Sequence, residues 1–230
     1  MLDVLAIGAH PDDVEIAMGG AIRVFLESGL KVGILDLTNG EPTPFGSPEE
    51  RAKEAQAAAE ALGVTVRRTL PLTNRELADT VEARRMVAET IREWRPQTLF
   101  IHYWDDAHPG HVAACRLCEA ARFYAKLTKT DMRGEPFYPE RMFYFFSNHF
   151  RGLHPKPAFI LDISDHIDTK MAAIKAYYTQ FEKGRPNGAE FYDLIKLRNA
   201  YSRSLIGTRY GGPFASREEI GLRGIRDLIR

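Results

Sequence analysis

The stretch Val4-Leu-Ala-Ile-Gly8-Ala-His10-Pro-Asp-Asp13 decides the fold class of this 230-residue chain. Four apolar residues that end at a glycine, with a proline and two aspartates close behind, are typical of a strand buried in a parallel sheet. Helical spacing of apolar side chains follows over 16–28, and another short apolar run follows over 32–37. A strand, a helix and a second strand in this order predict a right-handed βαβ unit.

The rest of the chain repeats this alternation. The same patterns predict further strands over 64–70, 98–103, 141–146 and 158–163, and further helices over 48–62, 80–94, 109–126, 167–181 and 190–205. The sequence therefore predicts an α/β fold with a Rossmann-like, doubly wound, mostly parallel sheet and helices on both faces. The elements after about residue 125 are C-terminal αβ additions, and the whole chain, 1–230, is expected to form a single domain.

The composition excludes several classes of protein. Lys plus Arg equals Asp plus Glu, at 31 each, which argues against a nucleic-acid binder and against binding to an anionic membrane surface. No run of 18 apolar residues and no signal-peptide pattern is present, so we expect a cytoplasmic protein. The two cysteines, Cys115 and Cys118, fall inside a predicted helix, where small buried packing residues are expected rather than a redox or zinc pair.

Two clusters of potential metal ligands follow the first and fourth predicted strands. The first is 9–15, Ala-His-Pro-Asp-Asp-Val-Glu, and the second is 105–111, Asp-Asp-Ala-His-Pro-Gly-His. Both contain His-Pro-x-[Asp/His], and in both we expect the proline to open the next helix. Alone, either motif is equally consistent with a helix cap. Together they lie at the sheet edge where α/β proteins build their sites, which indicates a metal centre.

These residues suit a catalytic zinc ion, one per chain. His10, Asp13 and His111 would supply two imidazoles and a carboxylate, and a fourth position would be left for water. Iron or cobalt also suits this donor set. Asp12 is then the expected base for the water, and His108 is expected to polarise the substrate carbonyl or to protonate the leaving amine.

The motif 10–13, the later His108-Pro-Gly-His111 and the order of elements resemble the PIG-L/LmbE-like deacetylases, zinc enzymes that hydrolyse N-acetylglucosamine derivatives. The segments 9–20, 46–51 and 204–214 are similar to the subgroup that makes bacillithiol, which acts on N-acetylglucosaminyl malate. The resemblance implies the same ligands, the same base and the same role for His108. The family often has Asp where this chain has Gly110, and that Asp is credited with orienting the neighbouring His. Here either Asp105 or Asp106 takes over this role, or His108 is less strongly assisted.

The resemblance also suggests two residues that bind the substrate. Arg51 stands in the first turn of a helix, where a cation opposes the helix dipole, and the family places an arginine here at the substrate. Tyr192 resembles a tyrosine that some relatives place near the metal. Glu15 is either a partner of His10 or an ordinary acid of the first helical turn. A closed homo-oligomer, a trimer or hexamer, is expected, and the apolar tail with Leu222, Ile225, Leu228 and Ile229 offers a surface for it.

Other functions remain open on the sequence alone. N-Acetylglucosamine and diacetylchitobiose are alternative small amino-sugar substrates for the same chemistry. A nucleotide-binding protein of the same fold class is disfavoured, because the turn after the first strand lacks the Gly-x-Gly-x-x-Gly pattern. A metal-binding protein without catalytic activity is a third alternative. Neither membrane nor nucleic acid is expected as a partner.

Overall fold

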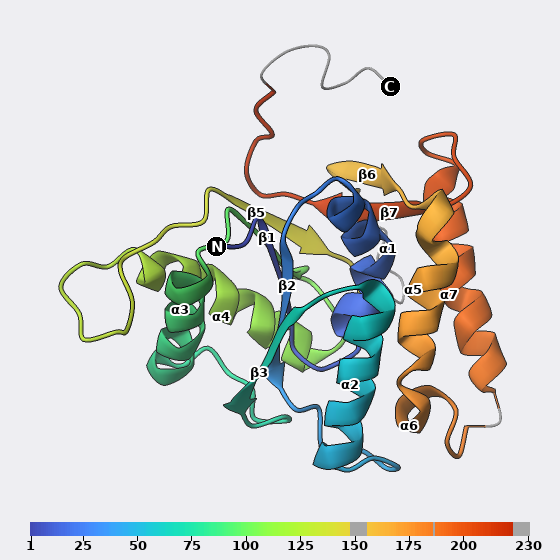
Figure 1. The fold of residues 1–230 in the computed structure, drawn as a ribbon, viewed down its shortest axis with the longest axis horizontal. Helices are drawn as coiled ribbons and strands as arrows, with labels where there is room; N and C mark the ends of the chain where they lie inside the picture. Colours follow the sequence, from blue (N-terminus) through green and yellow to red (C-terminus); the bar gives the residue numbers. More distant parts are fainter. Residues whose placement is uncertain (148–155, 186, 223–230) are drawn as a thin grey trace.

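The computed structural model describes residues 1–147, 156–185 and 187–222. Over these residues the chain forms a sheet with the strand order β3-β2-β1-β4-β5-β7-β6 (Figure 1). The strands are β1 (Val4–Gly8), β2 (Val32–Thr38), β3 (Val66–Leu72), β4 (Thr98–His102), β5 (Arg141–Phe145), β6 (Phe159–Asp162) and β7 (Gly211–Ala215). Strands β1 to β5 pair in parallel, whereas β7 runs antiparallel to both β5 and β6.

Helices cover both faces of the sheet. They are α1 (Asp13–Glu27), α2 (Pro48–Leu62), α3 (Val81–Trp94), α4 (Pro109–Ala125), α5 (Ile167–Lys175), α6 (Tyr178–Phe181) and α7 (Gly188–Arg203), with a 3-10 turn η1 (Ser164–His166). Helices α3 and α4 pack on one face, and α1, α2 and α5 pack on the other (Figure 1). Each face therefore has its own apolar core, and the predicted doubly wound fold is confirmed.

The chain reverses direction across the sheet between β1 and β4. From β1 it proceeds through β2 to β3 at one edge, and it then returns to place β4 on the other side of β1. Such a switch point opens a crevice beyond the carboxyl ends of the two central strands. Both predicted ligand clusters follow these two strands, so the topology brings them together.

The C-terminal third differs from its prediction in two places. The helix predicted over 167–181 is broken at Tyr177, whose ψ of 59° is not helical, and it becomes α5 and α6. Strand β7 was not predicted, because Gly-Gly-Pro at 211–213 has a low strand propensity and its pairing with β5 and β6 decides its conformation. In the apolar tail, Leu222 is exposed, while Ile225, Leu228 and Ile229 lie outside the described residues.

Two expectations drawn from composition can be compared with the structure. In the part of the chain that is described, no helix combines the length and the apolar character that a membrane crossing requires. Cys115 and Cys118 are both buried in the core beneath α4. Burial raises the pKa of the Cys115 thiol to about 12 and that of Cys118 well above its usual value, so both behave as packing residues, as predicted.

Candidate metal and catalytic site

The turn after β1 brings two acidic side chains into the crevice in different directions. Helix α1 begins at Asp13, and Pro11 lies in the turn before it. The prediction that Pro11 opens this helix was therefore wrong. The cause is Asp12, which has φ 113° and ψ −29°, a left-handed conformation that is strained for any residue but glycine. In the second motif Pro109 does open α4, with His108 as its N-cap.

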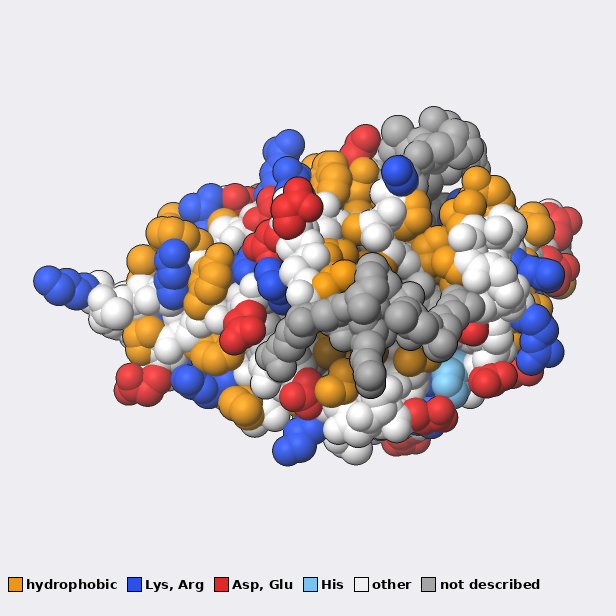
Figure 2. Space-filling view, turned by 90° about the horizontal axis from the view of Figure 1, so that it is seen from above, with side chains coloured by type: hydrophobic (Ala, Val, Ile, Leu, Met, Phe, Trp, Pro, Cys, Tyr) orange, Lys and Arg blue, Asp and Glu red, His pale blue; other side chains and the backbone are white. Residues whose placement is uncertain are grey.

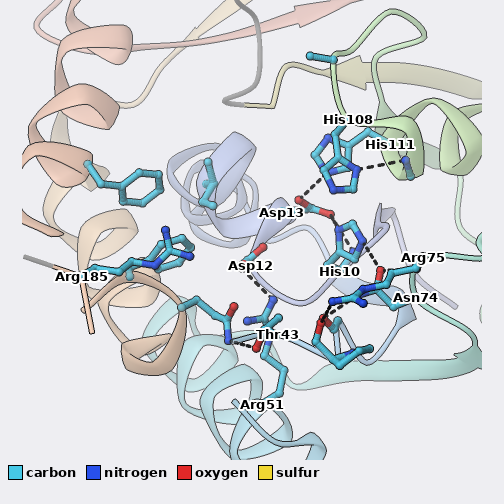
Figure 3. A pocket seen from close by; sticks show the side chains of 18 of the residues that line it. His10, Asp12, Asp13, Thr43, Arg51, Asn74, Arg75, His108, His111 and Arg185 are labelled. Atoms are coloured by element: carbon cyan, nitrogen blue, oxygen red, sulfur yellow. Dashed lines mark hydrogen bonds and ion pairs between the residues drawn. The ribbon is translucent and has the colours of Figure 1, made fainter. Parts of the chain in front are cut away.

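The three predicted ligands converge at the crevice (Figure 3). Asp13 Oδ2 lies 3.2 Å from His10 Nδ1, and Asp13 Oδ1 lies 3.1 Å from His111 Nε2. The rings of His10 and His111 have centroids 5.6 Å apart. All three residues are at most 9% exposed. Two imidazoles and one carboxylate are the donor set of a catalytic zinc site, so the chemistry of these residues suits the metal. Among the described residues, the ligand atoms of two overlapping groups lie within 4.8 Å of one another, namely His10 with His108 and His111, and Asp13 with His102 and His111.

The electrostatics of this cluster keep its acid ionised. Burial would raise the pKa of Asp13, but His111, His102 and His10 outweigh it and hold this pKa well below its usual range. Burial likewise lowers the pKa of His111, but Asp13 and Asp106 outweigh it and raise this pKa to about 10. A proton on His111 therefore balances the negative charge of Asp13 and Asp106, and a bound metal cation would replace that proton.

Asp106 fixes the orientation of His111. Its Oδ2 accepts a hydrogen bond from His111 Nδ1 at 3.0 Å and another from the hydroxyl of Ser147, which follows β5. Its Oδ1 accepts from the backbone N–H of His108 at 2.8 Å. With its Nδ1 bound to this carboxylate, His111 presents Nε2 to Asp13. Of the two acids that the sequence left open, Asp106 thus has a role at the site, as a partner of His111.

Gly110 stands against the ring of His108. A Cβ at this position would meet His108 Cε1 at 3.0 Å and Nδ1 at 3.1 Å. The backbone N–H of Gly110 donates to His108 Nδ1 at 3.1 Å. When Nδ1 accepts this bond, the proton of the neutral ring sits on Nε2, where it can be donated. This bond from the backbone of α4 favours that tautomer.

His102 is a site residue that the sequence reasoning missed. It ends β4, is 1% exposed, and stacks on His111 with ring centroids 4.2 Å apart. Its Nε2 accepts from the backbone N–H of Ala9 and lies 3.2 Å from Asp13 Oδ2. Burial and the nearby His111 lower the pKa of His102 to about 4, so its ring is neutral. A histidine at the end of an apolar run, shortly before the Asp105-Asp106 cluster, was the only signal for it.

Asp12 and Arg51 form a pair beside the ligands. Arg51 Nη2 lies 3.1 Å from Asp12 Oδ2, and their side chains are 4% and 14% exposed. Burial raises the pKa of Asp12 to about 7, although Arg51 opposes this shift. Figure 3 shows Arg51 reaching Asp12 from α2. Arg51 thus contacts the predicted base through Nη2, and its guanidinium lies 5.5 Å from the centre of the Tyr177 ring. Its Nε and Nη1 are buried and have no hydrogen-bond partner among the described residues.

Two further residues lie away from their expected places. Tyr192 packs among apolar side chains, and its hydroxyl donates to Glu182 Oε1 at 2.9 Å. It does not line the cavity at the metal site, because the adjacent Phe191 faces that cavity instead. Glu15 is neither a partner of His10 nor a solvated acid. It is fully buried, 2.6 Å from Arg67 and within hydrogen-bonding distance of Tyr177.

The site opens into a cavity of about 1340 Å³. The predicted ligands, Asp12, His108 and Arg51 all line it. Its outer wall comes from loops and helices distant in sequence, including Asn74 and Arg75 after β3 and the segment between α6 and α7. Asn74 Oδ1 lies 3.0 Å from His10 Nε2, so this loop also contacts a predicted ligand. A cavity of this size accommodates a disaccharide-sized molecule.

Comparison with known proteins places the chain in a family. Residues 5–122 match the model of the PIG-L family, described as GlcNAc-PI de-N-acetylase. The diacetylchitobiose deacetylase of Thermococcus kodakarensis is 28% identical over 98% of this chain and 84% of its own length. A probable N-acetyl-α-D-glucosaminyl L-malate deacetylase 2 of Bacillus cereus is 26% identical over 78% of this chain and 84% of its own length.

A solved structure shares nearly the whole fold. The conserved protein TT1542 from Thermus thermophilus superimposes with a TM-score of 0.88 at 38% identity, and the match covers 96% of this chain and 97% of that one. The family match spans both ligand clusters, His10 to Asp13 and His108 to His111, as well as the crevice between them. The chain belongs to the PIG-L family, as its two His-Pro motifs predicted.

Proposed function

We propose that this protein is a zinc-dependent hydrolase that removes the acetyl group from an N-acetylglucosamine derivative. The observation that carries the proposal is the convergence of His10, Asp13 and His111 with Asp12 beside them at the base of a cavity. Membership of a family described as de-N-acetylases supports it, as does the similarity to deacetylases of acetylated amino sugars.

The residues of the site divide the work of amide hydrolysis. A bound zinc ion supplies Lewis acidity toward the amide carbonyl and lowers the pKa of water. Asp12 accepts the proton of the attacking water, and Arg51 holds its carboxylate in place. His108, with a proton on Nε2, donates to the developing oxyanion or to the leaving amine. Acetate and a free amino sugar are the products.

The proposed substrate is N-acetylglucosaminyl malate. Segments 9–20, 46–51 and 204–214 are similar to the bacillithiol subgroup, and a malate deacetylase is among the relatives. N-Acetylglucosamine and diacetylchitobiose are the alternative substrates, and the second is the substrate in the name of the Thermococcus relative. The three compounds share the acetamide and differ in what is attached to the sugar.

A panel of N-acetylated sugars tests this proposal. The zinc-loaded protein is incubated with N-acetylglucosaminyl malate, N-acetylglucosamine and diacetylchitobiose, and released acetate is measured. We expect release from all three, with the highest kcat/KM for the malate conjugate. No release from any of them would contradict deacetylation, while a preference for diacetylchitobiose would contradict only the substrate assignment.

A further inference from the structure

The charges that line the cavity are unbalanced. Four arginines line it, namely Arg51, Arg75, Arg185 and Arg198, but only two carboxylates do so among the described residues. Asp13 is held among the histidines, and Asp12 is paired with Arg51. The other three arginines have no ion-pair partner in the described part of the chain. The cavity therefore carries an excess of positive charge before any metal is added.

Arg75 is fixed at the rim next to a predicted ligand. Its backbone has φ 60°, in the left-handed region, and the residue before it, Asn74, contacts His10. The Arg75 guanidinium donates to the carbonyl oxygen of Pro42 at 3.2 Å. Arg75 is exposed, but its backbone conformation and its bond to a neighbouring loop hold it beside the cavity that it lines.

Arg185 and Arg198 come from the other wall. Arg185 lies between α6 and α7, and Arg198 lies on α7. Figure 3 shows Arg75 and Arg185 on opposite sides of Asp12, so positive charge lines the cavity from both walls. Burial lowers the pKa of Arg198, and the nearby Asp106 only partly opposes this shift. A half-buried guanidinium without an ion pair gains most from an anionic ligand.

This concentration of charge is local. The chain as a whole has a net charge of zero, and Figure 2 shows acidic and basic side chains interspersed over one face of the molecule. An uncharged sugar would leave Arg75 and Arg185 without an ion-pair partner among the described residues, and Arg198 with only the more distant charge of Asp106. A cavity of one sign raises the local concentration of ligands of the other sign.

We propose that Arg75, Arg185 and Arg198 form an anion-binding rim that selects substrates with a carboxylate or phosphate on the aglycone of the amino sugar. This inference rests on the proposed deacetylase function and names residues that read the substrate. Guanidinium groups bind both anions through paired hydrogen bonds, so the rim recognises the shared chemistry of the two. Arg51 is not part of the rim, because Asp12 holds it.

Three substrates and four variants test the rim. The substrates are N-acetylglucosaminyl malate, N-acetylglucosamine 1-phosphate and the uncharged methyl N-acetylglucosaminide. The rim variants are Arg75→Gln, Arg185→Gln and Arg198→Gln. The control is Arg209→Gln, which removes an exposed arginine that pairs with Asp165 at 3.8 Å and does not line the cavity.

We expect each rim variant to lower kcat/KM for the anionic substrates by about tenfold or more, because a charge-assisted hydrogen bond is lost. The uncharged substrate should change by less than about twofold, and added salt should slow only the anionic substrates. The control variant should match the wild type on all three. The anionic substrate whose kcat/KM falls further in the rim variants identifies its group, carboxylate or phosphate, as the one that the rim binds. Equal losses on charged and uncharged substrates would overturn the proposal.

Binding measured without turnover separates this inference from the proposed function. Calorimetry with glucosaminyl malate, glucosamine 1-phosphate and methyl glucosaminide needs no hydrolysis. We expect the two anions to bind at least about tenfold more tightly than the uncharged sugar, and the rim variants to lose this difference. If acetate is never released but this preference is seen, deacetylation fails and the rim stands. Equal binding of all three by the wild type would overturn the rim, whatever the activity.

Discussion

Asp12 combines features that a purely structural residue seldom has. It adopts a left-handed backbone without being glycine, it is largely buried, and its carboxylate is held by Arg51. Such backbone strain persists only where the surroundings enforce it, and it is frequent at catalytic centres. Its neighbour Asp13 points instead among the histidines. Two adjacent carboxylates thus take different environments, which is the basis for assigning them different roles.

Substitution separates these two roles. Asp12→Asn should keep the metal but lower acetate release by about a hundredfold or more, because a general base is lost. Asp13→Asn should release the metal, because a ligand is lost. Metal content after gel filtration and the rate of acetate release measure the two effects. Metal loss in Asp12→Asn together with metal retention in Asp13→Asn would show that the roles are reversed.

Asp106 should affect the metal through His111. Asp106→Asn removes the carboxylate that orients the ring, and partners of this kind are worth about tenfold to a hundredfold in metal affinity. Asp105→Asn is the matched control, since Asp105 is exposed and adjacent in sequence. Competition with a fluorescent chelator gives the zinc Kd of each variant. An unchanged Kd for Asp106→Asn, or an equal change in both, would contradict the positioning role.

At the scale of elements, local signals explain what the sequence predicted. Ser47 caps α2 by accepting from the Glu50 N–H, and Gly63 ends the helix with φ 78°, as their residue types indicate. The elements up to about residue 125 were predicted within a few residues, because period and caps agree there. Strand β7 has no such local signal, and its conformation comes from pairing with β5 and β6, which are distant in sequence.

The site follows the same rule. Two compact motifs contain the predicted ligands and catalytic residues, so their spacing in the sequence was enough to predict a site. These residues are His10, Asp12, Asp13, His108 and His111. His102 and three of the four cavity arginines, Arg75, Arg185 and Arg198, were missed, since each stands alone in sequence and only the fold gives it neighbours. Tyr192 is the opposite case. It was predicted to contact the substrate, but its side chain packs in an apolar cluster.

The contact between α5 and α7 contains a buried lysine with a consequence for stability. Lys170 is 1% exposed, and its Nζ donates to Asn199 Oδ1 at 2.9 Å. Burial lowers its pKa from 10.5 to about 7. Below pH 7 the lysine is charged in both the folded and unfolded states, and burial of that charge disfavours folding. Between pH 7 and about 10 the unfolded chain binds the extra proton, so stability should rise with pH.

Lys170→Met tests this pH dependence. From pH 7 to 9, the wild type should gain up to about 1.4 kcal/mol of unfolding free energy per pH unit relative to the variant. The free energies come from urea unfolding at each pH. Lys196→Met, at an exposed position on α7, is the control and should follow the wild type. Parallel profiles for wild type and Lys170→Met would contradict the buried-lysine explanation.

At the scale of the whole molecule, the outer side of α7 offers a surface for association. Leu197 and Tyr201 lie four residues apart on this helix, are 65% and 69% exposed and do not line the cavity. The spacing places them on one face, and an exposed apolar stripe is typical of an interface. A homo-oligomer, a trimer or hexamer, stays our prediction.

Light scattering at micromolar concentration measures this association directly. We expect a mass that is a multiple of the 26.0 kDa chain. Leu197→Glu should reduce it, because a charge would be buried in the interface. A 26 kDa particle for the wild type would contradict the prediction, and an unchanged mass for the variant would place the interface elsewhere.

We propose that one zinc ion, held by His10, Asp13 and His111, supports deacetylation at the switch point of the sheet. The most direct test of this proposal is to measure zinc per chain and acetate release together, before chelation, after chelation and after zinc is returned. We expect about one zinc per chain, loss of both signals on chelation and recovery of both when zinc is returned, with neither signal in His111→Ala. Acetate release that persists without metal, or full zinc content in His111→Ala, would contradict it.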